Sequence, residues 1–179
     1  MSTPTTYPAH ALANGFIAAA ATPAATSRGD VTPTRTLSRV EVEHLVYVAH
    51  GLTLAMYDRP LLADPVVAVR ERLTIPTLRA AIPRAGTDRP LVAFDPELGT
   101  FREVEPPPPS DAVACWAVQA VWARYAFDVE LAVCVDAQGK GSPWAQIAGR
   151  RGFRPGTVVP DAMTERYFAE FAAAELSRN

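Results

Sequence analysis

A run of apolar positions extends from Ser110 to Phe127, and only Gln119 and Arg124 interrupt it. Two polar positions five residues apart are too few to form a solvated stripe along a helix. A helix without a polar face has to be covered by other elements on every side. The pattern therefore predicts a central helix, residues 110–127, around which the remaining elements pack.

A second helical pattern begins at Ser38, a good N-cap residue that is followed by acidic residues in the first turns. It predicts a helix that ends near Tyr57. Apolar side chains recur at helical spacing on one of its faces, namely Val42, Leu45, Ala49, Leu52 and Met56. This face is expected to pack against the core.

Proline positions suggest two shorter helices after it. Asp64 can cap a helix that has Pro65 at its first position and reaches Arg72, and Pro76 favours another helix over residues 75–82. Leu91–Phe94 and Thr100–Val104 then alternate in polarity on either side of a five-residue loop. This alternation predicts a β-hairpin.

The four prolines at 106–109 predict a stiff spacer that leads to Ser110, the expected N-cap of the central helix. Beyond that helix, Val129–Val135 has the composition of a strand, with Trp144–Ala148 as its expected hairpin partner. Pro160 and Asp161 predict the start of a last helix, which continues to about Leu176.

The order of these elements predicts an α+β fold, in which helices pack on a small, mostly antiparallel sheet around the helix at 110–127. Residues 1–36 contain few large apolar side chains, so we expect a disordered N-terminal tail followed by a single α+β domain, residues 37–179. Two interpretations of the tail are open: it is passive, which the composition favours, or it orders on a partner through a cluster of larger side chains, namely Tyr7, His10, Leu12, Phe16 and Ile17.

The composition narrows the classes of partner. A formal charge of −2 and an isoelectric point near 5.9 argue against nucleic-acid binding, which needs a basic surface. No stretch has the roughly 18 to 20 apolar residues that cross a bilayer, and the chain starts without the basic segment of a secretion signal. Cys115 and Cys134 are too few for a disulfide framework. We therefore expect a cytoplasmic protein with no membrane or nucleic-acid partner.

The strongest catalytic candidates lie on the helix that begins at Ser38. Glu43, Tyr47 and His50 follow one another at spacings of four and three residues, which places their side chains along one line of the helix. Such a line can act as acid and base on a ligand. The alternative is that this side packs against another element or subunit, with Tyr47 and His50 as satisfied polar groups. None of the usual metal-binding motifs is present, and the sequence leaves the cofactor unknown.

Basic residues near the C-terminus form a candidate ligand-binding site. Lys140 lies between glycines in a turn, and Arg150, Arg151 and Arg154 follow within fifteen residues. If they converge, they form one basic patch that can bind an anionic small molecule through bidentate hydrogen bonds. The alternative is a solvated loop.

Two functions follow from these patterns. The first is a non-catalytic accessory or assembly protein, which binds a protein partner through an apolar and aromatic surface and its flexible tail, or forms a homodimer through the helix that begins at Ser38. The second is a small enzyme or ligand-binding protein that uses Glu43, Tyr47 and His50, with the arginine loop orienting an anionic ligand. The sequence leaves the enzymatic status open and favours the first function.

Overall fold

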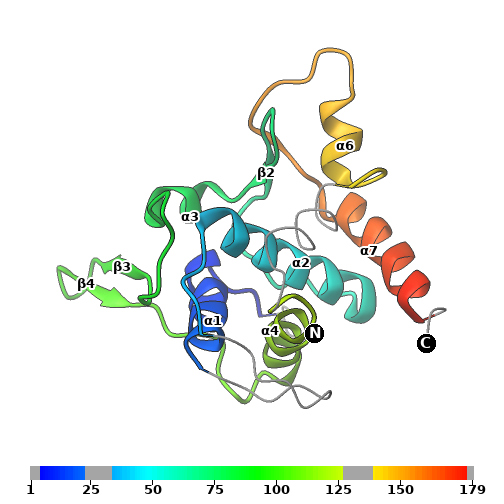
Figure 1. Cartoon of the computed structure of the whole chain (residues 1–179). Helices are drawn as coiled ribbons and strands as arrows, with labels where there is room; N and C mark the ends of the chain where they lie inside the picture. Colours follow the sequence, from blue (N-terminus) through cyan, green and yellow to red (C-terminus); the bar gives the residue numbers. More distant parts are fainter. Residues whose placement is uncertain (1–4, 23–33, 127–138, 177–179) are drawn as a thin grey trace.

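The computed structural model describes residues 5–22, 34–126 and 139–176 (Figure 1). Its helices are α1 (Ala9–Ala21), α2 (Arg39–Tyr57), α3 (Pro76–Ala81), α4 (Ala112–Tyr125), α6 (Pro143–Ala148) and α7 (Asp161–Leu176). Its strands are β1 (Val67–Ala68), β2 (Leu73–Thr74), β3 (Val92–Asp95), β4 (Thr100–Glu103) and β5 (Thr157–Val158). The α+β fold class is confirmed.

The strands form two small antiparallel sheets. In the first sheet β1 lies between β2 and β5, and Val67 pairs with Thr74 on one side and with Val158 on the other. The second sheet is the β3–β4 hairpin, which has the predicted strands to within one residue at each end. Its loop is one residue shorter than predicted, because Asp95 pairs with Thr100. The hairpin projects from the helical body (Figure 1).

Helix α2 occupies the middle of the helical body, where α1, α4 and α7 pack against it. Its predicted start is confirmed by a capping box, in which the Ser38 side chain accepts from the Glu41 amide and the Glu41 side chain accepts from the Ser38 amide. Asp58, in the left-handed conformation, ends the helix. Met56, expected on the core face, is 51% exposed at this end.

Helix α4 differs from the expectation of burial on every side. It begins one residue later than expected, because the Asp111 side chain caps the helix by accepting from the Ala114 amide at 3.0 Å. Its buried face includes Ala117, Val121 and Tyr125, whereas Gln119 and Arg124 lie on an exposed face. Alanines such as Ala112 and Ala123 also lie on this exposed face, so the sequence pattern did not distinguish it from the buried face.

The structure differs most from the sequence prediction in the N-terminal segment. Residues 9–21 form α1, and Leu12 and Phe16 are fully buried, so the expectation of a disordered tail over residues 1–36 is wrong for this helix. The Asp64 carboxylate accepts from the Ala9 amide at 2.7 Å and so caps α1 from 55 residues away. The docking segment expected here therefore belongs to the core.

A cluster of polar side chains holds the start of the chain in place. The Tyr7 hydroxyl donates to Asp111 Oδ2 at 2.7 Å, and Arg59 Nη1 donates to Asp111 Oδ1 at 2.7 Å. The Arg59 guanidinium beside Asp111 holds the pKa of that carboxyl well below its ordinary value. These contacts join the chain before α1 to the loop after α2 and to the cap of α4.

Some of the other predicted helices and strands are confirmed and some are wrong. Helix α3, the β3–β4 hairpin and α7 are confirmed. The helix expected from Asp64 to Arg72 is wrong, because β1 lies there, and the strand expected at Trp144–Ala148 is helix α6, capped by the Ser142 side chain. The strand expected at Val129–Val135 lies outside the described residues. None of the described helices is long and apolar enough to cross a membrane.

Candidate functional site

The three candidate catalytic residues of α2 point into the protein. Glu43 and Tyr47 are 1% exposed and His50 is 2% exposed. Helix α7 packs along the side of α2 that carries Tyr47 and His50. Another element of the same chain thus covers the surface that the sequence offered for a homodimer interface.

His50 uses both ring nitrogens within the fold. Nδ1 accepts from the backbone amides of Leu61 and Leu62, each at 3.2 Å, so the proton of the neutral ring is on Nε2. Nε2 lies 3.2 Å from Asp161 Oδ1, and this hydrogen bond holds the pKa of Asp161 below its ordinary value. The ring joins α2 to the 61–62 segment and to the first turn of α7.

Tyr47 lies next to the aromatic side chains of α7. Its hydroxyl is 3.4 Å from Thr164 Oγ1, and its ring meets the Phe168 ring edge to face at a centroid distance of 5.6 Å. Burial raises the pKa of the Tyr47 hydroxyl. Gly51 makes this approach feasible, since a Cβ at that position would lie 2.1 Å from Phe168 Cδ2. The contact is a close helix-to-helix packing contact.

Glu43 lies nearer the start of α2, where it contacts β2 of the first sheet. Thr74 Oγ1 of β2 donates to Glu43 Oε1 at 2.8 Å, and Arg72 Nη2 lies 3.7 Å from Glu43 Oε2. Burial raises the pKa of the Glu43 carboxyl, and the Thr74 hydrogen bond and nearby arginines partly oppose that rise. Glu43 therefore contacts a different part of the fold from Tyr47 and His50, and all three side chains are buried.

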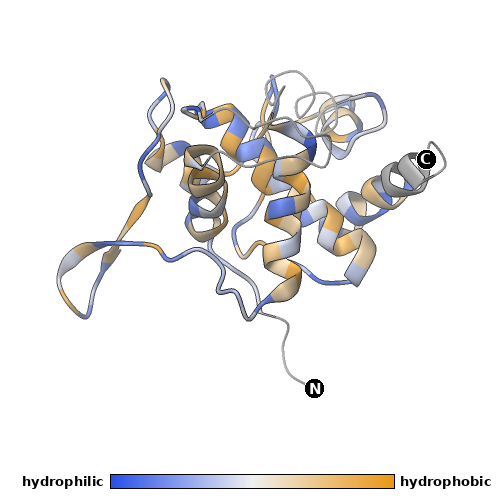
Figure 2. Ribbon diagram, turned by 60° about the horizontal axis from the view of Figure 1, so that its bottom comes forward, coloured by the Kyte–Doolittle hydropathy of each residue, from blue (hydrophilic) through white to orange (hydrophobic). Residues whose placement is uncertain are grey.

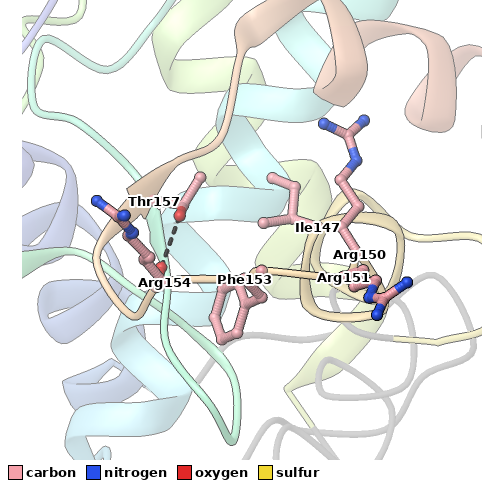
Figure 3. A pocket seen from close by; sticks show the side chains of 7 residues that line it. Ile147, Arg150, Arg151, Phe153, Arg154 and Thr157 are labelled. Carbon is pink, nitrogen blue, oxygen red and sulfur yellow. Dashed lines mark hydrogen bonds between the residues drawn. The ribbon is translucent and has the colours of Figure 1, made fainter.

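The arginines near the C-terminus line a pocket of 230 Å³, together with Ile147, Gly152, Phe153 and Thr157. Their guanidinium groups diverge: Arg154 points to one side of Phe153, and Arg150 and Arg151 point away on the other (Figure 3). Lys140 lies in the turn before α6 and is not part of this lining. The single basic patch that the sequence suggested would need convergence, and these side chains do not converge.

The β3–β4 hairpin exposes the largest group of apolar side chains that sequence reasoning did not select as a site. Val92, Phe94, Leu98 and Phe101 are between 50% and 67% exposed. The register pairs Phe94 with Phe101 and Val92 with Glu103, so one face of the ribbon carries Val92 and both phenylalanines, with Glu103 at its edge. The ribbon and its apolar stretches project from the helical body (Figure 2).

The other face of the same ribbon is polar. Asp95 pairs with Thr100 and Ala93 with Arg102, and Arg102 Nη1 lies 3.3 Å from Asp95 Oδ2. The hairpin is therefore amphipathic, although both of its faces lie in solvent. The sequence signal for this surface was the pair of large apolar residues, Val92 and Phe94, at alternate positions just before the predicted turn.

A buried amide fixes the base of the hairpin. The Asn14 side chain of α1 donates to the carbonyl oxygens of Leu91 at 3.0 Å and Val104 at 2.7 Å, and it accepts from the Leu91 amide at 2.6 Å. Asn14 is 3% exposed. The projecting ribbon is thus attached rigidly to the helical body.

Within the described part of the chain, no group of three or more histidine, cysteine, aspartate or glutamate side chains is placed to hold a metal ion. Comparisons with known protein families, with curated protein sequences and with solved structures find no match.

Proposed function

We propose that this protein is a non-catalytic accessory or assembly protein that binds a partner protein through the apolar face of the β3–β4 hairpin. The observation that carries the proposal is the exposure of Val92, Phe94 and Phe101 on one face of a ribbon whose other face is polar. An isolated two-stranded hairpin is marginally stable in water and gains most from a surface that covers its apolar face.

The rigid attachment of the hairpin supports this function. The three hydrogen bonds of Asn14 hold the base of the ribbon, so little ordering entropy is lost when the tip binds. Phe94 and Phe101 form an edge-to-face pair at 5.5 Å, which presents one aromatic anchor of the kind that dominates binding energy in interfaces.

Charge around the ribbon indicates the chemistry of the partner. Residues 88–105 contain five acidic and two basic residues, a net charge of −3. The complementary surface is an apolar groove bordered by lysine and arginine side chains. A second copy of this chain is a poorer occupant, because two acidic hairpins would repel each other.

The test uses two valines with the same substitution. Val92 and Val158 are exposed to 50% and 56%, and both lie in strands, so Val158→Ser is a matched control for Val92→Ser. Native mass spectrometry is applied to four tagged proteins purified from the native cells: the wild type, the two single variants and the double variant Phe94→Ser/Phe101→Ser. A co-purifying polypeptide is then purified and titrated with each form.

We expect the partner to bind wild type and Val158→Ser equally. Loss of the aromatic pair should weaken binding by roughly 30-fold, as truncation of an interface anchor does, and Val92→Ser should weaken it less. Association should also slow as salt is added. Equal binding by all four forms, a bare monomer from native cells or a homodimer that survives the double substitution would each overturn the proposal.

The cellular setting is part of the same proposal. We assign the protein to the cytoplasm, where the thiol of Cys115, which forms no disulfide within the described residues, is kept reduced. An enzymatic role for Glu43, Tyr47 and His50 has less support, because all three side chains are buried and the Tyr47 hydroxyl, His50 Nε2 and Glu43 Oε1 contact other elements of the fold.

A further inference from the structure

Four arginines from separate parts of the chain line one pocket of 420 Å³. Arg39 is the first residue of α2, Arg72 directly precedes β2, Arg79 belongs to α3, and Arg84 follows α3. Val40 and Glu71 complete the lining. Both α3 and β2 pack against α2, and this packing gathers side chains that are up to 45 residues apart in the sequence.

The charges of this pocket are unbalanced. Its lining contains four guanidinium groups and the carboxylate of Glu71, and the buried carboxylate of Glu43 lies 3.7 Å from Arg72. With both carboxylates ionised, two positive charges remain uncompensated. A protein with an overall formal charge of −2 therefore gathers a net positive charge in this pocket.

The guanidinium groups also retain unused hydrogen-bond donors. Among the described residues, Arg79 and Arg84 form no ion pair. Arg39 donates from Nη1 to the Arg79 carbonyl at 3.4 Å, while its buried Nε has no hydrogen-bond partner in the described part of the chain. A buried donor is nearly always paired in folded proteins, so an acceptor that enters this pocket would satisfy Arg39 Nε and could also accept from the exposed guanidinium groups of Arg79 and Arg84.

We infer that the pocket formed by Arg39, Arg72, Arg79 and Arg84 binds the phosphate group of a small phosphorylated molecule. A phosphate carries nearly two negative charges at neutral pH, which matches the two uncompensated charges, and its oxygens accept bidentate hydrogen bonds from arginine. A carboxylate supplies half of that charge. Val40 is the one apolar residue of the lining, so the molecule that carries the phosphate is polar.

Calorimetric titration of the full chain with inorganic phosphate tests this site at constant ionic strength, with acetate as the singly charged comparison. Arg79→Gln and Arg84→Gln are the test variants, because both side chains are exposed and their loss leaves the packing intact. Arg154→Gln removes the same charge at the divergent arginines and is the matched control.

We expect phosphate to bind wild type and Arg154→Gln equally and more tightly than acetate does. Each test variant should weaken phosphate binding by roughly tenfold, the size of one lost charge-assisted hydrogen bond, and Arg79→Lys should recover part of that loss. Circular dichroism checks that the variants are folded. Equal weakening in Arg154→Gln, or phosphate binding no tighter than acetate binding, would overturn the inference. This result is independent of partner binding at the hairpin.

Discussion

Asn14 and Leu91 form a reciprocal pair of hydrogen bonds: the Leu91 amide donates to Asn14 Oδ1 at 2.6 Å, and Asn14 Nδ2 donates to the Leu91 carbonyl at 3.0 Å. This pair connects the helix that sequence reasoning missed to the hairpin that we propose as the binding surface. A buried amide that makes three hydrogen bonds holds the two elements in one relative position.

Substitution of Asn14 should therefore be costly. Asn14→Leu keeps the branched shape of the side chain but leaves the buried Leu91 amide and the Val104 carbonyl without this partner, and we expect a loss of about 3 kcal/mol in the free energy of unfolding. Urea titration measures the loss. Gln146→Ala, which removes an exposed amide bonded to the Gly141 carbonyl, should change stability by less than about 0.5 kcal/mol. Equal effects of both substitutions would contradict the assigned role of Asn14.

Two helical glycines should respond in opposite directions to the same substitution. Gly51→Ala places a Cβ 2.1 Å from the Phe168 ring, and this overpacking should outweigh the gain in helix propensity and destabilise by about 1–2 kcal/mol. Gly15→Ala meets Val118 at an ordinary 3.4 Å and should stabilise α1 by about 0.5 kcal/mol. Thermal unfolding measures both. A smaller cost of Gly51→Ala in a Phe168→Leu background would identify the ring as the cause, and an unchanged cost would not.

His50 should behave as a structural residue. His50→Ala removes the acceptor of the buried Leu61 and Leu62 amides, so we expect a loss of about 2–4 kcal/mol and faster hydrogen exchange at those amides. His50→Asn can place an oxygen near the position of Nδ1 and should restore part of the stability. Asp161→Asn is the control, because the Asp161 side chain is 60% exposed. If His50→Ala were as stable as the wild type, the structural role of His50 would be contradicted and a chemical role would be favoured.

The stability of the protein should depend on pH through His44. Burial lowers the pKa of His44 from 6.5 to about 4, and the nearby Arg72 guanidinium adds to that shift. Between these values the unfolded chain binds the proton and the folded chain does not, so stability falls as the pH falls from about 6.5 to about 4. The expected loss is roughly 3 kcal/mol.

His44→Gln isolates this effect, because glutamine does not titrate. The difference in unfolding free energy between wild type and His44→Gln should vary with pH over this range and become constant above pH 7. Glu43 acts in the opposite direction, since burial raises its pKa and the folded chain takes up that proton first, but both proteins share this contribution. Parallel pH profiles for the two proteins would show that His44 is not the titrating group.

The sequence by itself determined the elements whose start and end signals are local. Ser38 and Glu41 form the cap of α2 within four residues, Asp95 turns the chain at the hairpin by accepting the amides of Glu97 and Leu98, and Pro160 precedes α7. In each case the residues that satisfy the backbone lie within a few positions of it. The α+β class follows from these elements.

Only the tertiary structure decided which of the weaker patterns fold, and where the candidate sites lie. Helix α1 reads as a bland alanine-rich tail because its cap, Asp64, and the partners of Asn14 are between 55 and 90 residues away in the chain. The line of Glu43, Tyr47 and His50 is real, but α7 and β2 supply the partners that engage it. The four arginines that line the proposed phosphate-binding pocket follow no regular spacing in the sequence. The packing of α2, α3 and β2 brings them together.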